Sequence, residues 1–502
     1  MSERKGPSKG QSRGAALGAA LFIFVAATLI VTLCSKSSPL YPLNDWVDSN
    51  CFFTVGKSVL SGVVPYRDLI EQKGPVLYFI HTLAALVSYH TFFGVYLIEI
   101  VTAFVFLWYS FKTVRLLTDG RYVLVTLPIL AAFVFTSSAF AHGDSVEEFT
   151  LAPWAYAIYV GFKTLKTKRP PSAWEAVLIG ITSGLVFWSK YTLVGLYVGW
   201  FVLVAWTTVE AEGLGALGRL IAQILGGVLI VTLPVLFYFA LHGALDDLFQ
   251  VYFVSNLAVY SRGQEHGKLL NIVNGFKNSF QFLRAAGFAT AMGLVLMAFL
   301  EPVKDVLHWV LQYGMAVAFI FVGGRSYVYY PLALGAFIAM PAIAVERLMA
   351  VRVRKHRRAG GLNPLASLAS LLLCLSLCWQ FSGNAYLRFE EPQNMPQFQF
   401  AEIINKKPNA TLLNMGFLDG GFYTTTGIVP SERAFVLLNL PDDRIWNMQV
   451  EAALAGRPDF IVTRNSEPEL PRYDIVARAS YFFEADQNYT LYQKKEDEGA
   501  KR

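Results

Sequence analysis

Residues 62–79, GVVPYRDLIEQKGPVLYF, place a dense group of charges directly before an apolar and aromatic run. The charged side chains are Arg67, Asp68, Glu71 and Lys73. The Gly-Pro pair at 74–75 is an ordinary helix start. A solvated turn is the simplest interpretation of these charges, so their meaning depends on where the rest of the chain places them.

The composition is that of a membrane protein. Of the 502 residues, 54% are hydrophobic and only 16% are charged, whereas soluble domains carry about 25% charged residues. The net charge of +6 lies in short basic clusters between apolar runs. This pattern indicates orientation in a bilayer and not nucleic-acid binding. The four cysteines have no metal-ligand spacing and predict no disulfide framework.

The apolar runs predict an α-helical polytopic protein with about eleven transmembrane helices, since a span needs roughly 20 apolar residues. The expected spans are 15–34, 92–111, 122–140, 150–163, 174–189, 191–208, 219–241, 286–303, 307–323, 327–347 and 363–381. With the basic tail 1–14 in the cytoplasm, every basic cluster falls on the cytoplasmic side. The short run 76–88 is then an interfacial helix in a first outer loop over 35–91, and the charge cluster lies outside the membrane.

The transmembrane domain, 15–384, is predicted to be followed by a small extracytoplasmic α/β domain over 385–494. Helical patterns near 397–405 and 443–456 alternate there with strand-like runs. The strand-like runs are ATLLNM, RAFVLLN, PDFIVT and two more that end at YTLYQ. About 100 residues suffice for a separate core, and the tail 495–502 is predicted to be disordered.

A second outer loop, over 242–285, contains YSRGQEHGK. Its glycines at 263 and 267 are possible hinges, which predicts a lid over the outer face. Disorder alone would leave the same sequence pattern.

Ionic and tyrosine side chains gather at four points of this predicted outer face. Besides the charge cluster they are Asp45 and Asp48, then Glu147 and Glu148, then Lys190 with Arg325 and Tyr329. Cations can hold a phosphate, and a carboxylate can accept a proton from an attacking hydroxyl.

Each of these residues also has a plain structural interpretation. Asp48 can cap a helix over 49–61, the two glutamates can be solvated, and Lys190 or Arg325 can anchor the chain at the interface. Only their convergence on one face favours a shared site.

Asp48 begins a spaced pattern that continues into the charge cluster. Phe52 follows four residues later, Gly56 eight and Gly62 fourteen, and EQKGPVLYF comes next. The pattern resembles the opening of the GT-C superfamily of polytopic glycosyltransferases. It is most similar to the glycosyltransferase family 39-like group of protein O-mannosyltransferases and the lipid A aminoarabinose transferase.

The match to that group departs at three positions. Ser49 stands where the group usually has Glu, Gln72 is inserted before Lys73, and Gly74 replaces a Pro of the Glu-Lys-Pro-Pro motif. These departures leave the subfamily open.

The resemblance implies sugar transfer from a polyprenyl-phosphate donor to a hydroxyl of a lipid, protein or polysaccharide acceptor, outside the plasma membrane. It implies an inverting reaction with Asp48 as general base and Glu148 as the second acidic residue. A divalent cation, if one is used, would lie between these two. The expected ligands of the donor phosphate are Lys73, Arg67, Lys190 and Arg325. The expected supporting or acceptor-binding residues are Asp45, Glu71, Glu147, Tyr66 and Tyr329.

Two other classes of function stay open at this point. A secondary transporter or flippase for an envelope precursor also uses intramembrane charges and broken helices, and a non-catalytic assembly factor would use the α/β domain to bind a partner. The two halves show no internal repeat, and the largest polar segments are all on the predicted outer face. Both features favour chemistry on one face over alternating access.

Overall fold

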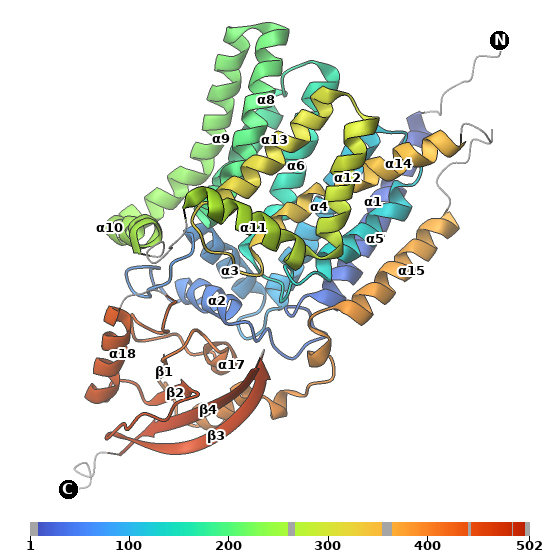
Figure 1. The fold of residues 1–502 in the computed structure, drawn as a ribbon. Helices are drawn as coiled ribbons and strands as arrows, with labels where there is room; N and C mark the ends of the chain where they lie inside the picture. The colour runs from blue at the N-terminus through green and yellow to red at the C-terminus, as the bar shows by residue number, and fades with distance from the viewer. Residues whose placement is uncertain (1–8, 260–266, 354–363, 440–442, 484, 497–502) are drawn as a thin grey trace, which may run out of the picture.

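The computed structural model describes residues 9–259, 267–353, 364–439, 443–483 and 485–496. They form a tall helical part and a C-terminal domain with one sheet, which lies against one end of the helices (Figure 1). One continuous hydrophobic core joins the two parts and includes Phe52 of the helical part and Phe422 of the C-terminal domain.

The helical part begins with α1 (Lys9–Cys34), α2 (Val47–Val59), α3 (Pro75–Val87), α4 (Phe93–Leu117), α5 (Val123–Phe135), α6 (Val146–Thr167) and α7 (Ala173–Ser189). It continues with the 3-10 turn η1 (Tyr191–Val194), α8 (Gly195–Glu212), α9 (Leu214–Leu241), α10 (Leu245–Leu248) and the π-helix η2 (Phe249–Val259). It ends with α11 (Lys268–Leu283), α12 (Ala285–Leu300), α13 (Val303–Phe321), the 3-10 helix η3 (Tyr330–Ile338), α14 (Ala339–Val353) and α15 (Pro364–Phe381).

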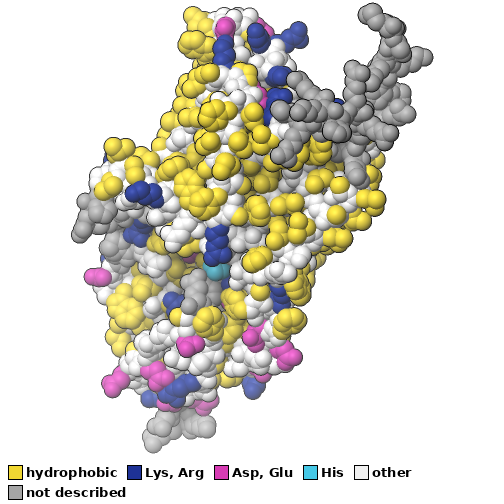
Figure 2. All heavy atoms as spheres, turned by 45° about the vertical axis from the view of Figure 1, so that its right-hand side comes forward, with side chains coloured by type: hydrophobic (Ala, Val, Ile, Leu, Met, Phe, Trp, Pro, Cys, Tyr) yellow, Lys and Arg dark blue, Asp and Glu magenta, His cyan; other side chains and the backbone are white. Residues whose placement is uncertain are grey.

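The helical part has the surface of a membrane protein. Six of its described helical segments are long and apolar enough to cross a bilayer, or seven if α11 and α12, bent by 116°, count as one span. Apolar side chains dominate the surface of the helices, whereas most Asp and Glu side chains in this view lie at the lower end of the molecule (Figure 2). The multi-pass, mostly helical fold class is confirmed. The number of eleven spans stays a prediction, because expected spans such as 122–140 and 174–189 correspond to the shorter apolar helices α5 and α7.

The predicted lid over 242–285 is helical where the structure describes it, in α10, η2 and α11. Residues 260–266, which include the first of its two hinge glycines, lie outside the described residues. The lid therefore stays a prediction.

Two short helices of the helical part, α2 and α3, lie between its longer helices and the C-terminal domain (Figure 1). A Cβ atom on Gly56 of α2 would lie 2.5 Å from the Cβ of His81 on α3, so these helices meet at backbone distance. Gly74 caps α3, donates its N–H to the Ser189 carbonyl at 3.1 Å, and leaves no room for a Cβ, which would lie 2.0 Å from the Trp188 carbonyl oxygen. A proline there would lack the donor and clash, which gives a physical reason for this departure from the resembled motif.

Replacing Gly74 with Ala should lower the free energy of unfolding by about 1–3 kcal/mol, because the backbone at the end of α7 must move. The thermal midpoint of the protein in detergent measures this. Gly226→Ala in α9 is the matched control, because no atom lies within 4 Å of its added Cβ. Equal midpoints for the two variants would contradict the packing argument.

The C-terminal domain contains the turns η4 (Ala385–Leu387) and η5 (Pro392–Asn394), the helices α16 (Pro396–Ile404), α17 (Phe422–Thr426) and α18 (Asp443–Ala455), and four strands. The strands are β1 (Leu412–Met415), β2 (Phe460–Arg464), β3 (Tyr473–Phe483) and β4 (Ala485–Lys494), in the sheet order β1-β2-β4-β3. β1 and β2 are parallel, with Leu412 opposite Phe460, and the other pairs are antiparallel. The small α/β domain is therefore confirmed.

One predicted strand of this domain is wrong. RAFVLLN, residues 433–439, forms no strand. The Ala434 carbonyl accepts a hydrogen bond from Gln449 Nε2 at 2.9 Å, and the Phe435 carbonyl accepts one from the Tyr423 hydroxyl at 2.9 Å. These side chains, together with isolated backbone hydrogen bonds to Ile70 and Phe417, take the place of the neighbouring strand that the pattern suggested.

Candidate active site

A cavity of about 580 Å³ opens where the helical part meets the C-terminal domain. Its lining comes from the start of α2, the loop before α3, the loops before α6 and η3, and the C-terminal domain. The lining includes Asp48, Glu71, Lys73, His142, Arg284, Tyr329, Tyr386 and Phe482. The cavity therefore collects side chains from segments that are far apart in the sequence.

Asp48 lies in the first turn of α2 and faces this cavity. Its Oδ2 atom lies 3.5 Å from Lys73 Nζ and accepts a hydrogen bond from the Tyr329 hydroxyl at 3.1 Å. The side chains of Asp48 and Lys73 are each 16% exposed, so both are accessible from the cavity. A carboxylate in this setting, at a helix N-terminus, is oriented and can accept a proton from a bound hydroxyl.

Lys73 is held by its own loop. Glu71 accepts hydrogen bonds from the Lys73 backbone N–H, at 2.9 Å, and from the Tyr78 hydroxyl. The Tyr66 hydroxyl donates to the Lys73 carbonyl at 2.6 Å. Glu71 and Tyr66, both predicted as supporting residues, thus fix the backbone that carries the ammonium group.

Arg67 is directed elsewhere. Its guanidinium pairs with Asp68 at 2.8 Å and donates to the His242 carbonyl at 2.9 Å. Arg67 lines neither the large cavity nor the smaller one described next. The structure therefore does not bring this predicted phosphate ligand to Lys73.

A smaller cavity, of about 160 Å³, adjoins the first at Gln72 and Lys73. Its lining combines two more cations, Lys190 and Arg325, with tyrosines and the apolar side chains of Leu257, Ile320 and Val322. Three of the four predicted phosphate ligands thus share one cavity.

Lys190 lies between α7 and η1 and is held in the smaller cavity. Its Nζ is 2.6 Å from Glu147 Oε1 and 3.4 Å from the ring centroid of Tyr330. Burial lowers the pKa of Lys190, and the Glu147 carboxylate opposes this shift. Arg325 donates to the Tyr327 hydroxyl at 3.0 Å. A phosphate that entered this cavity would meet an ammonium group already desolvated, where ion pairing is stronger than in water.

Glu148 is buried and lines neither cavity. Its Oε2 accepts the Asp144 backbone N–H at 2.8 Å, and its carboxyl lies against Glu99 of α4, which accepts from Ser35 Oγ at 2.8 Å. The structure therefore brings Glu147, and not Glu148, to a cationic partner. Among the described residues, no group of three or more His, Cys, Asp or Glu side chains is placed to hold a metal ion. A cation between Asp48 and Glu148 stays an untested expectation.

His81, which the sequence did not single out, anchors the loop below the site. Its Nδ1 donates to the Leu77 carbonyl at 2.8 Å, and its Nε2 lies 3.0 and 3.1 Å from the two Asp144 carboxylate oxygens. Burial raises the pKa of Asp144, and His81 opposes that shift. The pair joins α3 to the loop before α6, and both side chains are fully buried.

His81→Leu should lower the free energy of unfolding by about 3–5 kcal/mol, because it removes the imidazole that pairs with the buried Asp144 carboxylate. Thermal unfolding in detergent measures this loss. The exposed His90 supplies the control, and His90→Leu should change stability by less than about 0.5 kcal/mol. A small effect at His81 would show that the pair does not hold the loop.

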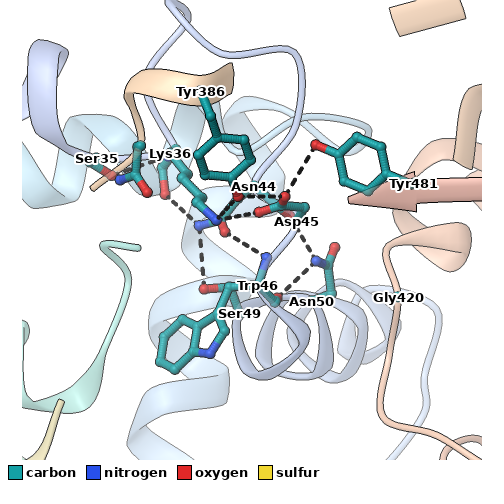
Figure 3. Close-up of polar contacts among 12 residues, drawn as sticks. Ser35, Lys36, Asn44, Asp45, Trp46, Ser49, Asn50, Tyr386, Gly420 and Tyr481 are labelled. Atoms are coloured by element: carbon teal, nitrogen blue, oxygen red, sulfur yellow. Dashed lines mark hydrogen bonds and ion pairs between the residues drawn. The ribbon is translucent and has the colours of Figure 1, made fainter. Parts of the chain in front are cut away.

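Asp45 joins the two parts of the molecule and does not line either cavity (Figure 3). Its carboxylate pairs with Lys36 and accepts hydrogen bonds from the hydroxyls of Tyr386, at 3.0 Å, and Tyr481, at 3.3 Å. It follows that Asp45 fixes the segment before α2 against the C-terminal domain.

Several cavity residues were not among the predicted site residues. His142 stacks on Trp46 with a ring-centroid distance of 5.2 Å, and Arg284 lies at the bend between α11 and α12. Tyr386 and Phe482 come from beyond the last span and reach the cavity only because the C-terminal domain folds back onto α2.

Comparisons with known proteins concern the family and the fold of this chain. Residues 72–238 match the family model of dolichyl-phosphate-mannose-protein mannosyltransferases, a stretch that contains Lys73, Glu147 and Lys190. The whole fold is similar to the crystal structure of ArnT from Cupriavidus metallidurans bound to undecaprenyl phosphate. The TM-score is 0.61 at 13% identity, over 97% of this chain and 98% of that one. No curated protein matches the sequence at a significant level. The family match over residues 72–238 and the shared fold confirm the resemblance to the GT-C superfamily of membrane glycosyltransferases.

Proposed function

We propose that this glycosyltransferase moves a sugar from a polyprenyl-phosphate donor to a hydroxyl group of a cell-envelope acceptor. The observation that carries the proposal is the position of Lys73. Its ammonium group lies where the two cavities meet, 3.5 Å from the Asp48 carboxylate. A phosphate site and a proton acceptor therefore lie side by side.

The smaller cavity suits the donor. Lys73, Lys190 and Arg325 give it three cations for a phosphate, and its apolar side chains suit the first units of a lipid chain. The ArnT structure of similar fold holds undecaprenyl phosphate. Cations that face the phosphate also stabilise the charge that builds up on it as the bond to the sugar breaks.

The larger cavity suits the acceptor. Its hydroxyl oxygen would attack the anomeric carbon while Asp48 takes the hydroxyl proton, and the bond from that carbon to the donor phosphate oxygen would break. The Tyr329 hydroxyl orients the Asp48 carboxylate for this transfer. With Asp48 facing the larger cavity and the phosphate in the smaller one, the acceptor would attack from the side of the sugar opposite to the leaving phosphate, and the configuration would invert.

We place both cavities and the C-terminal domain on the outer face of the plasma membrane, with the N-terminus in the cytoplasm. Support comes from the basic clusters between the apolar runs, which all fall on the cytoplasmic side in this orientation. An acceptor of the cell envelope is then on the same side as the site.

Mass spectrometry of surface glycans and of polyprenyl-linked sugars, in cells with and without this protein, tests the function. Loss of one surface sugar together with accumulation of its lipid-linked form would support transfer and would identify the sugar. If the purified protein instead moved a lipid or a solute across liposome membranes and formed no covalent product, it would be a transporter or flippase. That result would overturn the proposal.

A further inference from the structure

One face of α2 carries three polar side chains that point to the C-terminal domain. Asn50, Thr54 and Lys57 are spaced at i, i+4 and i+7, so they share one side of the helix. All three are buried. α2 lies directly beside α17, the short helix of the C-terminal domain (Figure 1).

Each of these side chains meets a partner in residues 419–424. The Thr424 hydroxyl donates to Asn50 Oδ1 at 2.9 Å, and the Thr54 hydroxyl donates to Asp419 Oδ2 at 2.6 Å. Lys57 Nζ donates to the Tyr423 carbonyl oxygen. A single short segment of the C-terminal domain therefore makes hydrogen bonds along two turns of α2.

Asp419 is itself rigidly held. Its second carboxylate oxygen accepts from Asn414 Nδ2 of β1 at 3.2 Å and from the Gly421 backbone N–H at 2.9 Å. Gly421 has a φ of +92°, and a Cβ there would lie 3.3 Å from Asn50 Oδ1. The sheet thus fixes Asp419, and the glycine allows the segment to approach α2 closely.

A second side of α2 is also closely packed, because Gly56 brings it to backbone distance from α3. Asp48 lies in the first turn of α2, the helix that these contacts hold. A shift of the 419–424 segment must therefore move α2 against α3 or tilt it, and either motion displaces the Asp48 carboxylate from Lys73.

Burying the charged groups Lys57 and Asp419 at this contact costs desolvation free energy, which favours a role beyond stability. Burial lowers the pKa of Lys57 to about 7, with Asp419 opposing the shift, and burial also raises the pKa of Asp419. Buried ionic groups seldom add net stability compared with apolar residues of similar size, and their better-supported use is to fix one arrangement.

We infer that the C-terminal domain positions the catalytic base, with Asp419 and Lys57 as positioning residues that act on Asp48 through α2. The inference rests on the proposed function, since it takes Asp48 as the base. It makes the C-terminal domain a working part of the active site and not an appended binding module.

The test compares Asp419→Asn and Lys57→Met in the full-length protein. Two quantities are measured: sugar transfer to the native acceptor in membranes, and binding of undecaprenyl phosphate to the purified protein. We expect transfer to fall about 10- to 100-fold, as for a reacting group misplaced by about 1 Å. Affinity for undecaprenyl phosphate should stay within about 2-fold, since no residue of α2 lines the smaller cavity.

Asp247→Asn is the matched control. Asp247 pairs with Arg433 of the C-terminal domain at 3.0 Å, partly exposed and away from α2, so its loss weakens the same interface without touching the helix. Its transfer rate should equal that of the wild type. If Lys57→Met does not fold, Thr424→Val, which removes the hydrogen bond to Asn50, should still lower transfer several-fold with binding retained.

Wild-type transfer in the Asp419 and Lys57 variants would overturn the inference. So would a parallel loss of transfer and undecaprenyl phosphate binding, or an equal loss in Asp247→Asn. A wild-type protein that transfers no sugar to any envelope acceptor would instead contradict the proposed function, so the two failures are distinguishable.

Discussion

Asp48→Asn should reduce the rate of sugar transfer by about 10²- to 10⁴-fold, the usual contribution of a positioned general base. The amide keeps the size of the side chain and can still meet the Tyr329 hydroxyl, but it cannot accept the proton of the attacking hydroxyl. The initial rate in proteoliposomes that contain lipid donors and acceptors extracted from the native membrane measures the loss.

The control for this variant is Asp68→Asn. Asp68 is also an aspartate of the segment before α3, but it pairs with Arg67, is 35% exposed and lines neither cavity. It should transfer sugar at the wild-type rate. Comparable activity of Asp48→Asn and the wild type, with both proteins folded, would remove Asp48 from the chemistry.

Lys73→Met should weaken undecaprenyl phosphate binding and lower transfer, the latter by about 10²- to 10³-fold, which is the effect of losing one preorganised charge-stabilising group. The side chain of similar length keeps the packing over the Phe52 ring, where Lys73 Nζ lies 5.1 Å from the centroid. Binding is measured by tryptophan fluorescence or by native mass spectrometry in detergent.

Arg67→Gln tests whether phosphate binding depends on Lys73, which lines the cavities, or also on the nearby Arg67. The sequence places Arg67 and Lys73 in the same cluster, but only Lys73 lines the cavities. We expect less than about a 2-fold effect on binding for a partly exposed ion pair of this kind. If Arg67→Gln and Lys73→Met had equal effects, the position of the phosphate proposed here would be incorrect.

Local sequence predicted most elements of this protein because their signals are local. The apolar runs predict α1 and α4, Gly74-Pro75 predicts the start of α3, and the strand-like runs predict β1 and β2. RAFVLLN failed because its hydrogen-bonding partners, which include Gln449, Tyr423 and Phe417, lie outside the run, and no pattern within it can reveal them.

The candidate site was predicted less completely, because the direction of each side chain decides which residues reach the site. Glu147 and Glu148 are neighbours on α6, about 100° apart around the helix. That rotation alone sends Glu147 to Lys190 and Glu148 to Glu99. Composition and charge cannot distinguish two such residues.

Long-range contacts account for the rest. Asp45 was predicted at the site, but its carboxylate meets Tyr386 and Tyr481, which lie 341 and 436 residues further along the chain. A separation of 365 residues likewise concealed the contact of Asp419 with Thr54. Both are interactions of the C-terminal domain, whose role the sequence left open.

The most direct measurement is a cryo-electron microscopy structure of the protein with undecaprenyl phosphate bound. The account predicts a phosphate oxygen within about 3 Å of Lys73 Nζ, beside Lys190 and Arg325, with the lipid chain leaving along the apolar side of the smaller cavity. A phosphate bound away from Lys73, or on the opposite side of the membrane from Asp48, would contradict it.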